Sequence, residues 1–218
     1  MIEAPINRLS KEYINTLPII KFAGDVVMVD QDEDIDKVVQ KLQKEEYVGF
    51  DTESRPSFTK GITYPISLIQ IATEEVAYLF RSNGNEFPGL LWNFLGDKNI
   101  LKIGIGLNGD MEKLKQFDRF YPGNFVDLSK IASEKGIIQV GARALTARYL
   151  EKRLVKTAQR TNWAVPNLTD KQKVYAATDA WICLKIYPLI QNDNNIYPPE
   201  EKEDEHKVED HVFPEEKL

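Results

Sequence analysis

With 218 residues, 42% of them hydrophobic, the chain is long enough to bury one substantial core, so we expect one domain with flanking segments. No run of about 18 apolar residues occurs, which argues against a membrane-spanning helix and predicts no membrane partner. The N-terminal residues lack the apolar stretch of a signal peptide. A lone cysteine, Cys183, fits a reducing compartment, so we expect an intracellular protein, cytoplasmic or, in a eukaryote, nuclear.

The net charge of −6 is concentrated at the C-terminus, because residues 200–218 hold nine acidic residues against three lysines. The rest of the chain is neutral overall, and its residues 143–160 form a basic stretch with one acidic residue, Glu151. This stretch is either a solvated face or a surface that holds nucleic-acid phosphates. Our candidates for phosphate contacts here are Arg143, Lys156 and Arg160.

The elements alternate between strands and helices along most of the chain. After an arm at residues 1–24, we expect strands at 25–29, 48–53, 66–72, 76–80, 100–105 and 125–126, the third and fourth forming an antiparallel hairpin. We expect a helix that follows an acidic lead at 30–36 and runs through about 45, and further helices at 87–95, 109–117, 128–135, 142–149 and 170–190, with Asp127 and Thr169 as N-caps. Residues 151–168 look irregular. This order predicts a mixed α/β sheet flanked by helices at residues 25–191, followed by an acidic, disordered tail at 192–218.

The apolar run at residues 47–50 ends in two carboxylates, Asp51 and Glu53. Strand residues alternate between faces, so these two side chains project to the same side. Two anions held so close repel each other unless a cation lies between them. Carboxylate oxygens suit Mg²⁺ or Mn²⁺, and neither ion needs histidine or cysteine as a ligand.

Three further residues can converge on that pair. Tyr175 and Asp179 are four residues apart in the last helix and therefore share one face, while Asp110 follows a strand where the next helix begins. Four carboxylates so arranged can bind two divalent ions about 4 Å apart, which activate a water and stabilise the departing 3′ oxygen of a phosphodiester. Tyr175 would orient the water, since a tyrosine with a pKa of about 10 is a poor base at neutral pH.

These residues occur in three segments that resemble the motifs of a known enzyme family. Asp51-Thr52-Glu53, Asn108-Gly109-Asp110 and Tyr175-Ala176-Ala177-Thr178-Asp179 are similar to the three exonuclease motifs of the DnaQ-like (DEDD) 3′–5′ exonucleases. The tyrosine four residues before the final aspartate resembles the tyrosine branch, which includes ribonuclease D and the Werner syndrome protein exonuclease domain. The resemblance covers about residues 25–190.

The resemblance implies a ribonuclease-H-like fold, metal binding by the four carboxylates, and water positioning by Tyr175. We add Asn108, within the second motif, as a candidate nucleic-acid contact. Ribonuclease D has helical nucleic-acid-binding domains after its catalytic domain, whereas an acidic tail follows here, and no helicase is fused. A free-standing exonuclease is therefore expected.

Three features allow other interpretations. Gly104, Gly106 and Gly109 match the G-x-G-x-x-G pattern of dinucleotide-binding proteins, but the charge of Asp110 at the helix start would repel a pyrophosphate. Asp127 is either an N-cap, which we favour, or a fifth metal ligand. Phe58 and Tyr64 either stack on terminal bases or pack in the core.

The sequence thus predicts a 3′–5′ exonuclease that uses two Mg²⁺ or Mn²⁺ ions to release 5′-mononucleotides from a single-stranded or frayed 3′ end of DNA or RNA. One alternative is a catalytically silent nucleic-acid-binding or scaffold module of the same fold. Another is a ribonuclease-H-type endonuclease, which would cut circular substrates. The choice between DNA and RNA stays open, because it depends on contacts to the 2′-hydroxyl.

Overall fold

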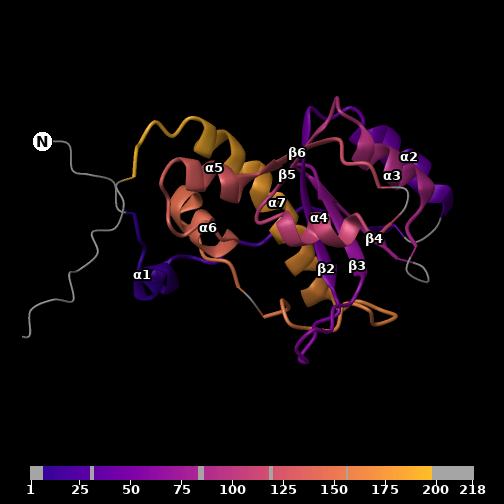
Figure 1. Cartoon of the computed structure of the whole chain (residues 1–218), viewed down its shortest axis with the longest axis horizontal. Coiled ribbons are helices and arrows are strands. Elements are labelled where there is room, and N and C mark those ends of the chain that lie inside the picture. The colour runs from indigo at the N-terminus through magenta and orange to yellow at the C-terminus, as the bar shows by residue number, and fades with distance from the viewer. Residues whose placement is uncertain (1–6, 30–31, 83–85, 118–119, 156, 198–218) are drawn as a thin grey trace, which may run out of the picture.

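A single mixed β-sheet between two layers of helices forms the body of the protein (Figure 1). The computed structural model describes residues 7–29, 32–82, 86–117, 120–155 and 157–197. The strands are β1 (Asp25–Val29), β2 (Tyr47–Ser54), β3 (Ile66–Ala72), β4 (Val76–Arg81), β5 (Leu101–Gly104) and β6 (Asn124–Asp127). The helices are α1 (Lys11–Thr16), α2 (Asp32–Leu42), α3 (Gly89–Gly96), α4 (Asn108–Leu114), α5 (Leu128–Glu134), α6 (Ala142–Leu150) and α7 (Asp170–Gln191).

The sheet has the order β1-β4-β3-β2-β5-β6. Strand β3 runs antiparallel to both β2 and β4, as the predicted hairpin requires, and the other neighbouring pairs are parallel. The carboxyl ends of β2, β5 and β6 therefore lie at one edge of the sheet, where polar side chains that follow these strands can meet. The predicted mixed α/β sheet with flanking helices is confirmed.

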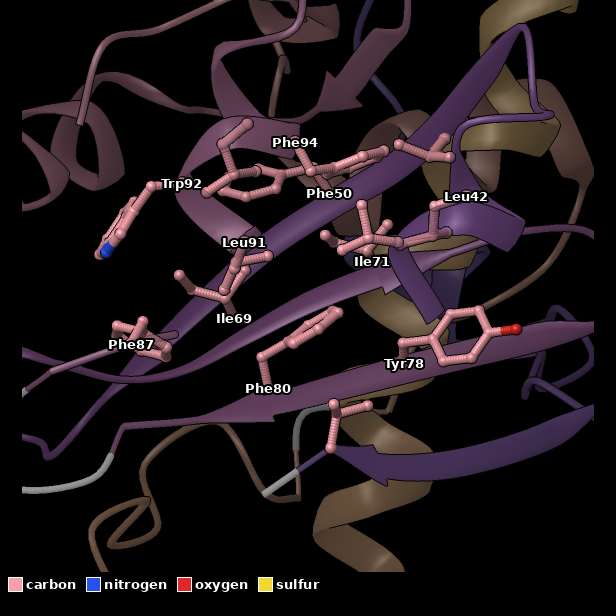
Figure 2. Packing of buried hydrophobic residues seen from close by; sticks show 14 of the residues in the cluster. Leu42, Phe50, Ile69, Ile71, Tyr78, Phe80, Phe87, Leu91, Trp92 and Phe94 are labelled. Atoms are coloured by element: carbon pink, nitrogen blue, oxygen red, sulfur yellow. The ribbon is translucent and has the colours of Figure 1, made fainter. Parts of the chain in front are cut away.

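Apolar side chains cover both faces of the sheet. On one face, Phe50, Ile69 and Phe80 pack against residues of α2 and α3 such as Leu42, Leu91 and Phe94 (Figure 2). On the other face, α7 crosses the strands, and α5 and α6 pack beside it. The strand residues alternate between these two cores, so β3 is buried along its whole length. No helix in the described part of the chain is long and apolar enough to cross a bilayer.

Capping residues fix the starts of two helices as predicted. The Asp127 carboxylate accepts a hydrogen bond from the backbone N–H of Ser129 at the start of α5. Thr169 and Gln172 form a reciprocal capping box at the start of α7. The structure also has a helix that the sequence did not predict, α1, which is capped by Ser10. Six residues are too few for a clear apolar period, so α1 lacked a sequence signal.

The segment after α7 packs on the body as far as the structure describes it. Tyr149 and Tyr197 donate hydrogen bonds from their hydroxyls to the Asp193 carboxylate, at 2.8 and 2.9 Å. The Tyr197 side chain is buried. Residues 192–197, which the sequence places in the tail, therefore lie against the domain, and residues 198–218 lie outside the described residues.

Candidate active site

The end of β2 presents two carboxylates on one face of the sheet. Asp51 and Glu53 alternate with Phe50 and Thr52, which point to the opposite face. The pairing between β2 and β3 slips directly after Glu53, so that Ser54 pairs with Ile66. Such an irregularity turns the strand where its side chains leave the sheet.

Close contact between α7 and β2 brings the third carboxylate to this pair. A Cβ atom added to Gly49 would lie 2.0 Å from the backbone oxygen of Ala180, so only glycine permits this approach. Ala176, Ala177 and Ala180 are fully buried on the side of α7 that faces the sheet. These small residues therefore allow α7 to pack close to β2, and Asp179 lies beside Asp51 and Glu53.

Three of the four predicted ligands form a tight cluster. One carboxylate oxygen from each of Asp51, Glu53 and Asp179 lies within 4.8 Å of the others. Asp110 lines the same cavity from the first turn of α4, and its carboxylate accepts a hydrogen bond from the Thr52 hydroxyl. Thr52 thus links the first motif to the second through the opposite side of β2.

The carboxylates lie in a cavity of about 590 Å³. Its remaining walls come from the turn after β5, the start of α6, the irregular segment before α7, and the N-terminal arm. The residues in these walls include Lys11, Ile14, Gly106, Gln139, Arg143 and Gln159. The cavity is large enough to hold a nucleotide-sized group next to the carboxylates.

Burial and mutual repulsion make the cluster a poor place for unpaired negative charge. The pKa of Asp51 is raised well above its ordinary value, first by burial and then by the charges of Asp110, Asp179 and Glu53. Burial and the charges of Asp179 and Asp110 raise the pKa of Glu53 to about 9. Burial also raises the pKa of Asp110. Cations between these oxygens would relieve both effects, and an all-carboxylate donor set fits a hard divalent ion.

Tyr175 points into the same cavity from one turn before Asp179. Its ring packs against the fully buried Trp163, with 6.0 Å between ring centroids. Burial, followed by the charge of Asp179 and a hydrogen bond to it, raises the pKa of Tyr175 above its ordinary value of 10.0. The hydroxyl therefore keeps its proton at neutral pH and can orient a water but cannot act as a base.

One cation next to the cluster, Lys113, was not predicted from the sequence. Lys113 donates a hydrogen bond from Nζ to the Ser54 hydroxyl at 2.9 Å. Its positive charge partly opposes the rise in the pKa values of Glu53 and Asp110. Lys113 follows Asp110 by three residues on α4, so helix periodicity could have placed it on the same side. Lys11 and Ile14 were also missed, and the sequence contains no local signal for them.

The glycine pattern is explained by a turn that Asp127 holds. The Asp127 carboxylate accepts hydrogen bonds from the backbone N–H groups of Gly106 and Leu107, at 2.8 and 2.9 Å. Gly106 has a φ of +75°, which glycine adopts without strain. The N–H groups that would face a pyrophosphate are therefore occupied by a side chain, which argues against dinucleotide binding. Asp127 is the N-cap that we favoured, and it also ties β6 to the turn after β5.

The predicted nucleic-acid contacts have different positions. Arg143 lines the cavity, whereas Asn108 and Arg160 are exposed and are not among the lining residues. Lys156 lies outside the described residues. Of the two loop aromatics, Phe58 is 84% exposed, so it does not pack in the core. Tyr64 is half-buried beneath the Arg55 guanidinium, 4.8 Å from its ring centroid.

A profile of the 3′–5′ exonuclease family matches residues 26–194, a range that contains all three motifs. The chain belongs to the 3′–5′ exonuclease family. This confirms the resemblance drawn from the motifs, and the exonuclease has the expected ribonuclease-H-like fold.

Three known proteins are similar to this exonuclease over most of its length. The bifunctional 3′–5′ exonuclease/ATP-dependent helicase WRN of mouse is 32% identical over 82% of this chain, which spans 13% of WRN. A 3′–5′ exonuclease of Arabidopsis thaliana is 29% identical over 84% of this chain and 69% of the plant protein. Ribonuclease D of Trypanosoma brucei, solved in complex with RNA U12, superposes with a TM-score of 0.70 at 19% identity, over 80% of this chain and 65% of that one.

Proposed function

We propose that this exonuclease hydrolyses the terminal phosphodiester bond at the 3′ end of a nucleic-acid strand and releases nucleoside 5′-monophosphates. The observation that carries the proposal is the cluster of Asp51, Glu53 and Asp179, which shares one cavity with Asp110 and Tyr175. Four carboxylates without a cation repel one another, so this arrangement favours the binding of cations. Two Mg²⁺ or Mn²⁺ ions match this donor set.

The roles of the residues follow from their positions. Asp51, Glu53, Asp110 and Asp179 would hold the ions. When bound, the ions supply positive charge that activates water for attack and stabilises the departing oxygen. The Tyr175 hydroxyl orients the water in line with the bond between phosphorus and the 3′ oxygen of the preceding nucleotide. That bond breaks, the 3′ oxygen ends as a hydroxyl, and the water oxygen becomes part of the released phosphate.

The shape of the cavity supports action at a strand end. Walls from the arm, the start of α6 and the segment before α7 surround the space next to the carboxylates. An intact duplex cannot place its terminal phosphodiester in such a space. We therefore propose a single-stranded or frayed 3′ end as the substrate, with DNA and RNA both to be tested.

The test uses matched 5′-labelled single strands of DNA and RNA with Mg²⁺, with Mn²⁺ or with EDTA. We expect a ladder that shortens from the 3′ end, requires the metal, and disappears with Asp179→Ala. The strand that is shortened faster identifies the preferred sugar. The proposal fails if the wild-type protein shortens neither strand with either ion.

Two controls separate the rival functions. Asp51→Asn keeps the shape of the side chain but removes a charge, and it should abolish cleavage while strand binding is retained. A silent binding module would instead bind strands equally well with and without this change and cleave in neither case. Circular single strands should stay intact, because cleavage of circles would identify an endonuclease.

A further inference from the structure

The N-terminal arm forms one wall of the active-site cavity. The match to the family profile begins at residue 26, so residues 7–20 precede the matched range. Nevertheless, Lys11 and Ile14 of α1 line the cavity that contains Asp51 and Asp179 (α1 is at the left of Figure 1, near α6). Part of the site is thus built by a segment that precedes the profile match.

The arm is fixed to the body along its length. The Asn7 side chain donates to the Gly136 carbonyl and accepts from the Ile138 N–H, both at 3.1 Å. The Gln139 side chain bonds both the N–H and the carbonyl of Leu9, at 2.8 and 3.1 Å. Beyond α1, the chain pairs with residue 153 through the Pro18 carbonyl and the Ile20 N–H. Hydrogen bonds before and after α1 therefore hold Lys11 and Ile14 in place.

The cavity has anions at one end and cations on the wall made by α1 and α6. Lys11 is exposed and forms no ion pair with any residue that the structure describes. Arg143 donates from Nη2 to the Asn15 side chain of α1 at 2.6 Å, and its buried Nε has no acceptor among the described residues. A neutral amide thus orients the guanidinium without neutralising it. Two cations without carboxylate partners face the space in which a strand would lie.

We propose that the N-terminal arm binds the nucleic-acid strand upstream of the scissile bond. Lys11 and Arg143 contact backbone phosphates of nucleotides that precede the terminal one, and Asn15 holds Arg143 in position. Ile14, which is buried but lines the cavity, offers an apolar contact to a base or sugar. The inference rests on the proposed function, because it assumes that the carboxylates hold the scissile phosphate.

The experiment compares a dinucleotide, which has only the scissile phosphate, with a twelve-nucleotide strand of the same sugar. Lys11→Glu should raise the KM for the long strand about tenfold and change kcat less than twofold. The ratio of kcat/KM on the long strand to that on the dinucleotide should therefore fall. Lys11→Ala should show a smaller fall, and Lys11→Arg should restore the ratio. Each lost phosphate contact should also lower the slope of log affinity against log salt by about 0.7.

The matched control is Lys98→Glu. Lys98 is exposed in the turn before β5, at the edge of the sheet opposite the carboxylates. Lys98→Glu changes the charge by the same amount without altering the cavity. The ratio of kcat/KM on the long strand to that on the dinucleotide should therefore stay at the wild-type value. If Lys11→Glu and Lys98→Glu give the same ratio and salt slope, the arm does not bind the strand.

Direct binding separates this inference from the proposed function. We would titrate a fluorescent twelve-nucleotide strand with each variant in Ca²⁺, measure anisotropy, and check folding by thermal melting. Weaker binding by Lys11→Glu in a protein that cleaves nothing would support the arm and refute the exonuclease activity. Normal cleavage with unchanged strand binding by Lys11→Glu would support the exonuclease activity and refute binding by the arm.

Discussion

Tyr175 has two attachments in the site, and each can be removed separately. Its ring packs on Trp163, while its hydroxyl lies by Asp179 in the cavity. Replacement by phenylalanine keeps the first contact and removes the second. The change therefore tests the hydroxyl alone.

Tyr175→Phe should lower kcat by about 10- to 100-fold, the usual scale for losing the alignment of a reacting group, with little change in KM. Steady-state kinetics and Mn²⁺ titration would check this, and the Mn²⁺ affinity should stay within a few-fold of the wild type. Tyr149→Phe is the control, because the Tyr149 hydroxyl also hydrogen-bonds an aspartate but lies outside the cavity. An unchanged kcat for Tyr175→Phe would remove this hydroxyl from the mechanism.

At the same scale, the sequence predicted residues whose roles depend on local spacing. Asp51 and Glu53 are two apart on a strand, and Tyr175 and Asp179 are four apart on a helix, so strand and helix periodicity alone places each pair on one face. Lys11 could not be predicted, because its place in the cavity depends on hydrogen bonds between residues more than 100 positions apart.

Among the elements, the packing of α7 on β2 decides whether the motifs meet. The contact depends on Gly49, which has no side chain to separate the strand from the backbone of Ala180. Sequence patterns predicted both elements and the N-cap of α7, because caps and apolar periods are local. They did not predict how closely α7 approaches β2, since that distance depends on which small residues face each other across the contact.

Gly49→Ala should push α7 away from β2, because the new methyl group would overlap the Ala180 carbonyl. We expect a loss of about 1–3 kcal/mol in the free energy of unfolding, as for other overpacked cores, and at least a tenfold loss of kcat/KM. Urea unfolding and cleavage assays would measure both.

The control is Gly109→Ala in α4, where an added Cβ meets nothing within 4 Å. Alanine favours helix over glycine, so this variant should gain up to about 1 kcal/mol of stability. Wild-type stability and activity in Gly49→Ala would show that the close contact is not what positions Asp179.

For the whole molecule, the buried carboxylates couple stability to pH and to metal. The ordinary pKa of Glu53 is 4.5, and in the folded protein it is about 9. Between these values the folded protein holds a proton that the unfolded chain has released. Rising pH therefore favours unfolding over this window, and the raised pKa values of Asp51 and Asp110 act in the same direction.

In EDTA, the melting temperature should therefore fall as pH rises from 6 to 9, and saturating Mg²⁺ or Mn²⁺ should oppose the fall by binding the ionised carboxylates. An ion at 100 times its Kd adds about 2.7 kcal/mol, or about 5–10 °C for a domain of this size. Asp51→Asn removes one charge from the cluster, so in EDTA at pH 8 it should melt above the wild type and gain less from metal. Thermal melts across pH, with and without metal, measure all three effects. A wild-type melting temperature that responds neither to pH in EDTA nor to metal would mean that the cluster does not take up cations.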